Sequence, residues 1–197
     1  FTIPEVNSFS TNLWFSAYGT GNVMNTIMLG FIYQGKIGIK MKPWDNTPIG
    51  WVNQNTFIGG QIGIQSGEGT NIPGAKYLEI SDHATNPGNN NTFVGTDFES
   101  NMPYYRVHCF GPNNAFINCR WEKTPCRVHF DGPNAFANRI WGGNNARFMD
   151  FQELNGAGWN TQENEAGFRG LLPGGPDGVY VIGNTGSATY PAFTVVS

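Results

Sequence analysis

Short runs of alternating apolar and polar or small residues recur along this chain, bounded by Gly, Pro and Asn. Ile37-Gly-Ile39-Lys-Met41 and Ile62-Gly-Ile64 are two of them. A period of two places the apolar side chains on one face of a strand, which is typical of half-buried β-strands. The pattern therefore predicts short strands that are separated by tight turns.

The segment from Arg106 to Asp150 repeats itself. Arg106-Val-His-Cys-Phe-Gly-Pro-Asn-Asn-Ala-Phe116 aligns with Arg127-Val-His-Phe-Asp-Gly-Pro-Asn-Ala-Phe136, and a weaker copy begins at Arg147. A repeat of about 20 residues is too short for tetratricopeptide, ankyrin or armadillo units, and the Leu pattern of leucine-rich repeats is absent. The repeat thus predicts an all-β fold, a right-handed parallel β-helix, with a small C-terminal β-segment.

Equivalent residues in successive coils of a β-helix lie about 4.8 Å apart. The repeat therefore predicts two ladders that build the fold rather than a site. The predicted members are Phe93, Phe116 and Phe136 in the interior, and Asn91, Asn114 and Asn134 at a bend.

The predicted β-helix domain covers residues 1–170, with irregular early coils over 1–50 and regular coils over 51–155. An insertion is expected between Gly67 and Gly88, because 36 residues separate Phe57 from Phe93 whereas the later intervals are 23 and 20. Residues 171–197 are expected to form a small β-segment that caps the last coil or contacts a neighbouring chain, since an uncovered coil end is an open sheet edge.

Composition and charge narrow the function. Only 13% of the residues are charged, 27 are Gly and 12 are Pro, which favours an all-β chain. A net charge of -3 argues against nucleic-acid binding, which requires a clustered basic surface. No apolar run is long enough for a membrane span, so no membrane insertion is expected.

The ends and the cysteines suggest two further expectations. The start at Phe1, without Met, suggests a fragment or a processed product. The three cysteines, Cys109, Cys119 and Cys126, have no Cys-x-x-Cys spacing, so buried free thiols are expected rather than a disulfide framework or a zinc site. No metal or other cofactor is predicted.

Three segments resemble the pectate-lyase-like parallel β-helix of bacteriophage tail spikes and tail fibres: residues 50–62, 91–99 and 114–122. The shared motif is Asn-x-Phe, followed six residues after the Phe by Glu in two of the coils. Gly63 and Gly142 hold the Glu position in two other coils, so the fold does not require an acid there.

The resemblance implies a homotrimeric protein of the virion tail that contacts other tail proteins. It would act extracellularly, recognising a bacterial surface polysaccharide during host attachment and sometimes cleaving it as a glycoside hydrolase or lyase. Because one fold carries many functions, two alternatives stay open. They are a free polysaccharide lyase or hydrolase of the same fold, and a virion spacer without a glycan site.

The candidate catalytic residues are Asp97, Glu99 and Glu122. Stacking would place Glu99 and Glu122 at equivalent positions of adjacent coils, with Asp97 on the same side of its strand. Glycosidases use two carboxyl groups about 5 to 9.5 Å apart, and crowding of like charges raises the pKa of one of them. The sequence therefore suggests glycoside hydrolysis.

A basic ladder offers another interpretation of the same region. Arg106, Arg127 and Arg147 recur with the repeat. In a stack they would neutralise the acids in surface ion pairs, which is the favoured interpretation, or they would bind an anionic sugar through bidentate guanidinium contacts.

Aromatic side chains provide the last candidates, because the flat faces of sugars pack on rings. Trp121 and Trp141 hold nearly equivalent positions in the repeat, so they would form either core packing or an elongated sugar platform. His108 and His129 also recur with the repeat and are expected to be structural, whereas His83 lies in the insertion and is a weak functional candidate.

Overall fold

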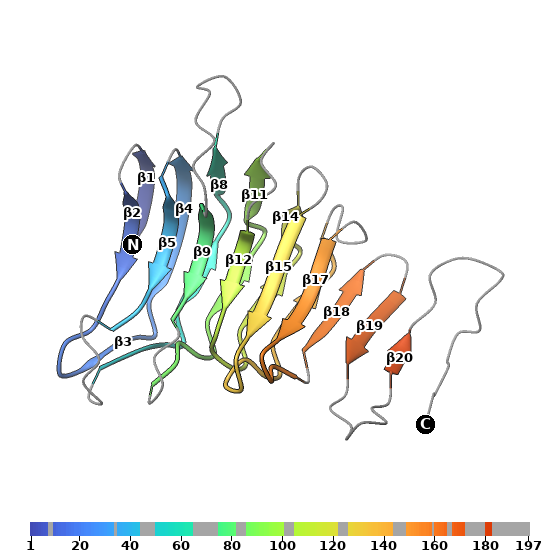
Figure 1. The fold of residues 1–197 in the computed structure, drawn as a ribbon. Helices are drawn as coiled ribbons and strands as arrows, with labels where there is room; N and C mark the ends of the chain where they lie inside the picture. The colour runs from blue at the N-terminus through green and yellow to red at the C-terminus, as the bar shows by residue number, and fades with distance from the viewer. Residues whose placement is uncertain are drawn as a thin grey trace.

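The computed structural model is an all-β chain in which most neighbouring strands are parallel (Figure 1). Within the part of the chain that it describes there is no helix, and so none that could span a membrane. The all-β prediction is thereby confirmed. The described residues are 1–7, 10–33, 35–43, 50–64, 75–81, 86–100, 105–121, 126–143, 149–158, 160–164, 167–171 and 180–182.

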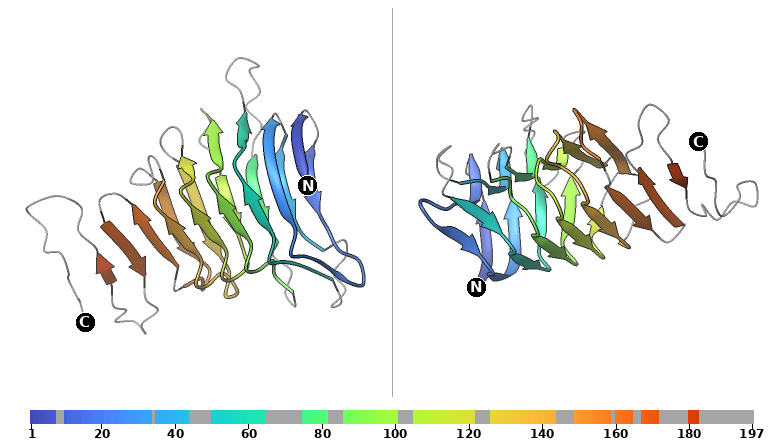
Figure 2. Two further views of the ribbon diagram at one scale, coloured as in Figure 1. Left: turned by 180° about the vertical axis from the view of Figure 1, so that it is seen from behind. Right: turned by 90° about the horizontal axis from the view of Figure 1, so that it is seen from below.

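One side of the fold is a six-stranded parallel sheet. Strands that are adjacent in this sheet are not consecutive along the chain. The chain therefore leaves the sheet, forms other strands and returns to it once per repeat (Figures 1 and 2). The spatial order is β17 (Met149–Leu154), β15 (Cys126–Asp131), β12 (Tyr105–Cys109), β9 (Lys76–Ile80), β5 (Ile37–Met41) and β2 (Thr11–Phe15).

A twelve-stranded sheet has two arms that meet at the long strand β4 (Thr26–Tyr33), along which β1 (Thr2–Asn7) also pairs. The first half of β4 pairs with one arm and the second half with the other. The first arm is β7 (Thr56–Ile58), β10 (Thr92–Val94), β13 (Ala115–Ile117), β16 (Arg139–Trp141) and β18 (Thr161–Asn164), and the second is β8 (Gln61–Ile64), β11 (Asp97–Ser100) and β14 (Arg120–Trp121).

The remaining strands lie at two places. β3 (Gly21–Val23) and β6 (Trp51–Asn53) form a short parallel pair. At the other end of the stack the pairing becomes antiparallel, from β18 to β19 (Gly167–Leu171) and then to β20 (Tyr180–Ile182). Most of the expected C-terminal segment, 171–197, lies outside the described residues.

A ladder of asparagines runs along one corner of the stack. In each step, Oδ1 of one asparagine accepts hydrogen bonds from the backbone N and from Nδ2 of the asparagine one repeat earlier, at 2.8–3.2 Å. The steps are 30, 36, 23, 24 and 22 residues long. The members are Asn25, Asn55, Asn91, Asn114, Asn138 and Asn160.

The corner requires a left-handed backbone immediately before the ladder residue. Each described residue in that position has a φ between 53° and 59°, although only two of the five are Asn and none is Gly: Met24, Gln54, Asn90, Asn113 and Ala137. A left-handed conformation costs an L-residue about 1–2 kcal/mol. The hydrogen bonds of the ladder offset this cost, so the corner tolerates Met, Gln and Ala.

The predicted asparagine ladder is right for Asn91 and Asn114 and wrong for Asn134. Asn138, four residues later, is the ladder member in that repeat. The reason is an extra turn after Asp131, in which the backbone N of Ala135 donates to the carbonyl of Gly132 at 3.0 Å. The turn adds residues before the corner, and the alignment of the two sequence copies did not account for them.

The phenylalanine ladder is corrected in the same way. The rings of Phe57, Phe93 and Phe116 stack in the core, with centroids 4.5 and 5.4 Å apart. The next inward residue is Ile140, which is in register with Phe116. Phe136 is 42% exposed and is not a core residue.

Two of the cysteines lie in this core. Cys109 and Cys119 are buried free thiols, as expected, and burial raises the pKa of each to about 12. Both are therefore unreactive thiols at neutral pH. The side chain of Cys126 lies outside the described part of the chain.

The asparagine ladder ends at a carboxylate. The backbone N and Nδ2 of Asn160 donate to Oε1 of Glu153 at 2.9 and 2.7 Å. Glu153 is in register with Phe130, a core position in the preceding strand. Burial raises the pKa of Glu153, and the hydrogen bonds from Asn160 oppose that shift. Glu153 thus supplies the acceptor that a further asparagine would otherwise provide.

Glu153 should make stability depend on pH. A carboxyl whose pKa is raised on folding stabilises the fold most at low pH, and this contribution is lost as pH rises through the raised value. Glu153→Gln keeps an acceptor for Asn160 without the charge. We therefore expect the variant to gain about 0.5 kcal/mol over the wild type between pH 4 and 7, after allowance for solvent screening. Urea unfolding at several pH values measures the difference, and a difference independent of pH would contradict this role.

Candidate functional site

The second arm of the large sheet, together with β1 and β4, presents two rows of outward side chains. Strand alternation points Ile32, Ile62, Phe98 and Trp121 inward, and the residues on either side of them outward. Register defines one row as Glu5, Phe31, Gln61, Asp97 and Arg120, and the other as Asn7, Tyr33, Gly63 and Glu99. We call these nine residues the acid–aromatic face.

Phe31 and Tyr33 form an aromatic pair on this face. Their rings are stacked, with centroids 5.5 Å apart and planes 19° from parallel, and Phe31 is 50% exposed. The hydroxyl of Tyr33 donates to Oε1 of Gln61 at 2.5 Å, which links the pair to the next strand. The face therefore combines an exposed ring with fixed polar groups, the combination that sugar-binding surfaces use.

The acids Asp97 and Glu99 lie on the other side of Gln61 from the aromatic pair. Nη1 of Arg120 contacts Oδ2 of Asp97 at 3.1 Å, and Oδ1 of Asp97 is buried without a hydrogen-bond partner among the described residues. Burial raises the pKa of Asp97, Arg120 opposes the shift, and the charge of Glu99 adds to it. The net pKa is raised, in the direction that a general acid requires.

Spacing along β11 gives the approximate separation of these two acids. Asp97 and Glu99 are two residues apart on one side of a strand, so their Cα atoms are about 6.6 Å apart. Glycoside hydrolysis requires two carboxyl groups on the same side of the substrate site, and alternation along β11 places these two acids on one side of the strand. Glu122, the third predicted acid, is outside the described residues.

Gly63 places no side chain between Tyr33 and Glu99. A Cβ at this position would lie 1.9 Å from the carbonyl oxygen of Glu99, so the backbone of β8 and β11 excludes any larger residue. The sequence showed only that Gly63 lacked the Glu of other repeats. The structure adds the reason, which is that the backbone of β11 leaves no room for a side chain at Gly63.

The two predicted tryptophans are not equivalent. Trp121 is in register with Phe98, whereas Trp141 is in register with Ile117 on the other arm of the sheet. Trp121 is only 1% exposed and stacks on Phe98 with centroids 4.7 Å apart. The structure thus corrects its assignment as a sugar platform, because the inward side of β14 holds it in the core.

Trp141 remains at the surface. It is 42% exposed, and the guanidinium of Arg139 lies 5.9 Å from its ring centroid. It belongs to the outward side of β16, around the bend from the acid–aromatic face. Trp141 therefore stays a separate candidate for sugar contact.

The predicted basic ladder does not form in the described register. Arg127 is opposite Tyr105 on one side and Asp150 on the other, and Arg106 falls at an irregularity between Tyr105 and Val107. Arg147 and the side chain of Arg106 lie outside the described residues. Asp97 pairs instead with Arg120. This pair was not predicted from the sequence, although the 23 residues between Asp97 and Arg120 equal one step of the asparagine ladder.

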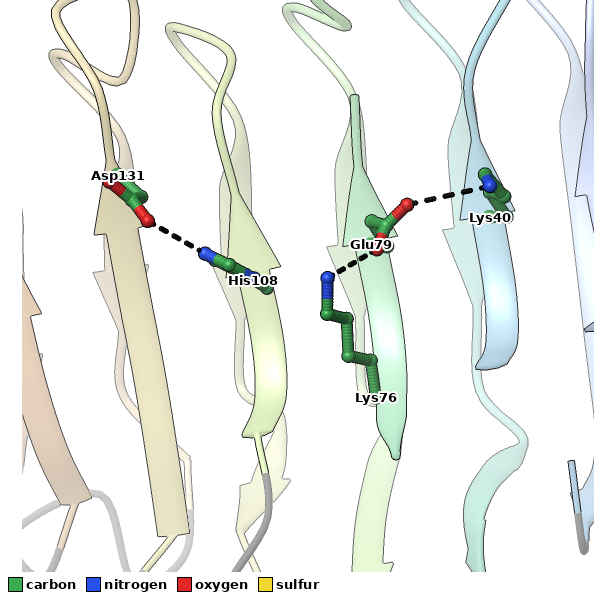
Figure 3. Close-up of polar contacts among 5 residues, drawn as sticks. All are labelled: Lys40, Lys76, Glu79, His108 and Asp131. Carbon is green, nitrogen blue, oxygen red and sulfur yellow. Dashed lines mark hydrogen bonds and ion pairs between the residues drawn. The ribbon is translucent and has the colours of Figure 1, made fainter. Parts of the chain in front are cut away.

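A second polar row runs across the outward side of the six-stranded sheet (Figure 3). Nζ of Lys76 and Nζ of Lys40 lie 2.5 and 3.7 Å from the carboxylate of Glu79, and Nε2 of His108 lies 3.0 Å from Oδ2 of Asp131. Burial lowers the pKa of His108, and Asp131 opposes that shift. In this row the charges of Lys40 and Lys76 compensate that of Glu79, and His108 forms a hydrogen bond with Asp131.

The remaining sequence candidates add nothing to the face. His129 is buried, consistent with a structural role, and His83 lies outside the described residues. Where side chains are described, no three His, Cys, Asp or Glu residues lie close enough together to hold a metal ion.

Comparison with known proteins finds no matching protein family, and no similar curated protein or solved structure.

Proposed function

We propose that the acid–aromatic face binds a bacterial surface polysaccharide, and that the stacked sheets are the sides of a right-handed parallel β-helix. The observation that carries the proposal is the juxtaposition of the Phe31–Tyr33 pair with Gln61, Asp97 and Glu99 on neighbouring strands. A ring packs on the apolar face of a sugar, while amide and carboxylate groups bind its hydroxyls.

The biological setting of the proposal comes from the resemblance in sequence. It is a tail spike or tail fibre of a bacteriophage, assembled as a homotrimer with other tail proteins, that binds host glycan outside the cell. A row of outward residues that crosses five strands suits an extended polymer, since adjacent strands are about 4.8 Å apart.

Cleavage of the bound glycan is a second candidate function. The raised pKa of Asp97, with Glu99 on the same side of β11, is the observation that favours it. Asp97 would protonate the glycosidic oxygen, and Glu99 would act as the base or the nucleophile. The ion pair with Arg120 argues for a structural role of Asp97 instead, so product analysis has to decide.

Removing the exposed ring should weaken glycan binding. On an array of purified bacterial surface polysaccharides, we expect Phe31→Ala to lose about tenfold or more in affinity, because a central aromatic contact typically contributes that much. Phe136→Ala is a matched control, since it removes an exposed ring far from the face in the repeat register. Incubating the protein with the polysaccharides that it binds, and analysing the solution for shortened products, shows whether cleavage occurs. The same assay shows whether Asp97→Asn or Glu99→Gln abolishes cleavage.

The variants separate the candidate surfaces. Unchanged binding by Phe31→Ala would exclude the acid–aromatic face, and a loss confined to Trp141→Ala would move the site to the other arm of the sheet. Products that persist in both acid variants would exclude catalysis by these carboxylates.

A further inference from the structure

The acid–aromatic face carries an excess of negative charge. Its rows contain three carboxylates, Glu5, Asp97 and Glu99, and one guanidinium, that of Arg120. Arg120 already contacts Asp97 at 3.1 Å, so its charge is directed at an acid of the same face. The polar row on the six-stranded sheet differs, because Lys40 and Lys76 both contact Glu79 there (Figure 3).

The field of these carboxylates reaches the aromatic pair. Burial raises the pKa of Tyr33, and the charges of Glu99, Asp97 and Glu5 raise it further, in that order. Negative potential therefore covers the side of the face where a sugar would stack. Gly63 contributes to this, because no side chain separates Tyr33 from Glu99.

We infer that this face selects glycans by charge, favouring sugars with unsubstituted amino groups over neutral sugars and rejecting sugars with carboxylate, sulfate or phosphate groups. The inference rests on the proposed glycan binding and adds the chemical class of the ligand. A carboxylate is only an acceptor, and a protonated amine donates charge-assisted hydrogen bonds to it. An anionic sugar would meet like charges, which disfavours association.

This selectivity is the reverse of one alternative considered for the arginine ladder, the binding of an anionic sugar. The ladder was expected mainly to neutralise the acids, and the described register places Tyr105 and Asp150 on either side of Arg127. On the acid–aromatic face, Arg120 pairs with Asp97, and Glu5 accepts a hydrogen bond from Asn7. The charge preference therefore follows from the strand register, and it changes the class of ligand.

Three probes of matched length test the inference on the same array: hexamers of glucosamine, of N-acetylglucosamine and of galacturonic acid, at pH 6 and low salt. We expect the glucosamine hexamer to bind about two- to fivefold more tightly than its acetylated counterpart, as for exposed ion pairs. The preference should disappear at high salt, because the charges are screened. The galacturonic acid hexamer should not bind.

Two variants assign the effect to this face. Glu99→Gln should abolish the preference for the free amine, so that the glucosamine and acetylated hexamers bind this variant equally, whereas Glu79→Gln, an identical change on the six-stranded sheet, should leave the preference intact. Tighter binding of any acidic glycan than of neutral ones, or equal affinity for the two glucosamine probes, would overturn charge selection while leaving glycan binding in place. If no glycan on the array binds, that result would contradict the proposed function itself.

Discussion

Asn114→Ala is expected to lower the free energy of unfolding by about 3–5 kcal/mol, because several buried hydrogen bonds are lost together. Nδ2 of Asn114 donates to the carbonyl oxygens of Gly88 and Gly111 at 3.1 and 3.2 Å, and to Oδ1 of Asn138 at 3.1 Å. Its Oδ1 accepts from the backbone N of Asn91 at 3.0 Å. Alanine would leave these buried groups without partners in two adjacent repeats.

Asn134→Ala is the matched control for this variant. The repeat in the sequence makes Asn134 the equivalent of Asn114, whereas the structure places Asn138 in the ladder. We expect Asn134→Ala to change stability by less than about 0.5 kcal/mol, as is usual for substitutions away from buried networks. Urea unfolding followed by tryptophan fluorescence measures both variants. Equal losses would mean that the ladder follows the sequence alignment and not the described register.

Phe116→Ala should cost about 3–5 kcal/mol, the usual range when a buried phenyl ring is truncated. Phe116 is fully buried between Phe93, with which it stacks at 5.4 Å, and Trp121, whose ring centroid is 6.0 Å away. A cavity there would interrupt the core of the stack, because packed strands on either side prevent its collapse.

Phe136→Ala provides the comparison, because the sequence repeat aligns Phe136 with Phe116 and the structure leaves it 42% exposed. We expect a loss of less than about 1 kcal/mol for this variant. Thermal unfolding of both variants distinguishes the two registers. Similar losses would show that Phe136 is in the core and that the described register of β16 is wrong.

The sequence predicted the candidate acids better than their surroundings. Asp97 and Glu99 are outward on one strand because alternation with a period of two places them so, and that pattern is visible locally. The same alternation would have placed Trp121 inward, since Arg120 precedes it on the outward side of β14. Phe31, Tyr33 and Gln61 were missed, because only strand pairing brings β4 and β8 beside β11.

The sequence by itself determined the class of fold. Alternating apolar residues, Gly, Pro and Asn in the turns, and the recurrence of Asn-x-Phe suffice for parallel strands with an asparagine at each corner, because these preferences are local or repeat with the chain. The tertiary structure alone decided the register. Turns of different length separate the strands, so ladder steps of 22 to 24 residues replace the 20 suggested by the alignment.

Register in turn decided which residues meet. A shift of four residues moves Phe136 to the surface and brings Ile140 into the core, and the pairing of β11 with β14 sets Arg120 beside Asp97. The physical reason is that strand pairing is fixed by burial of inward side chains over the whole stack. No single repeat carries that information.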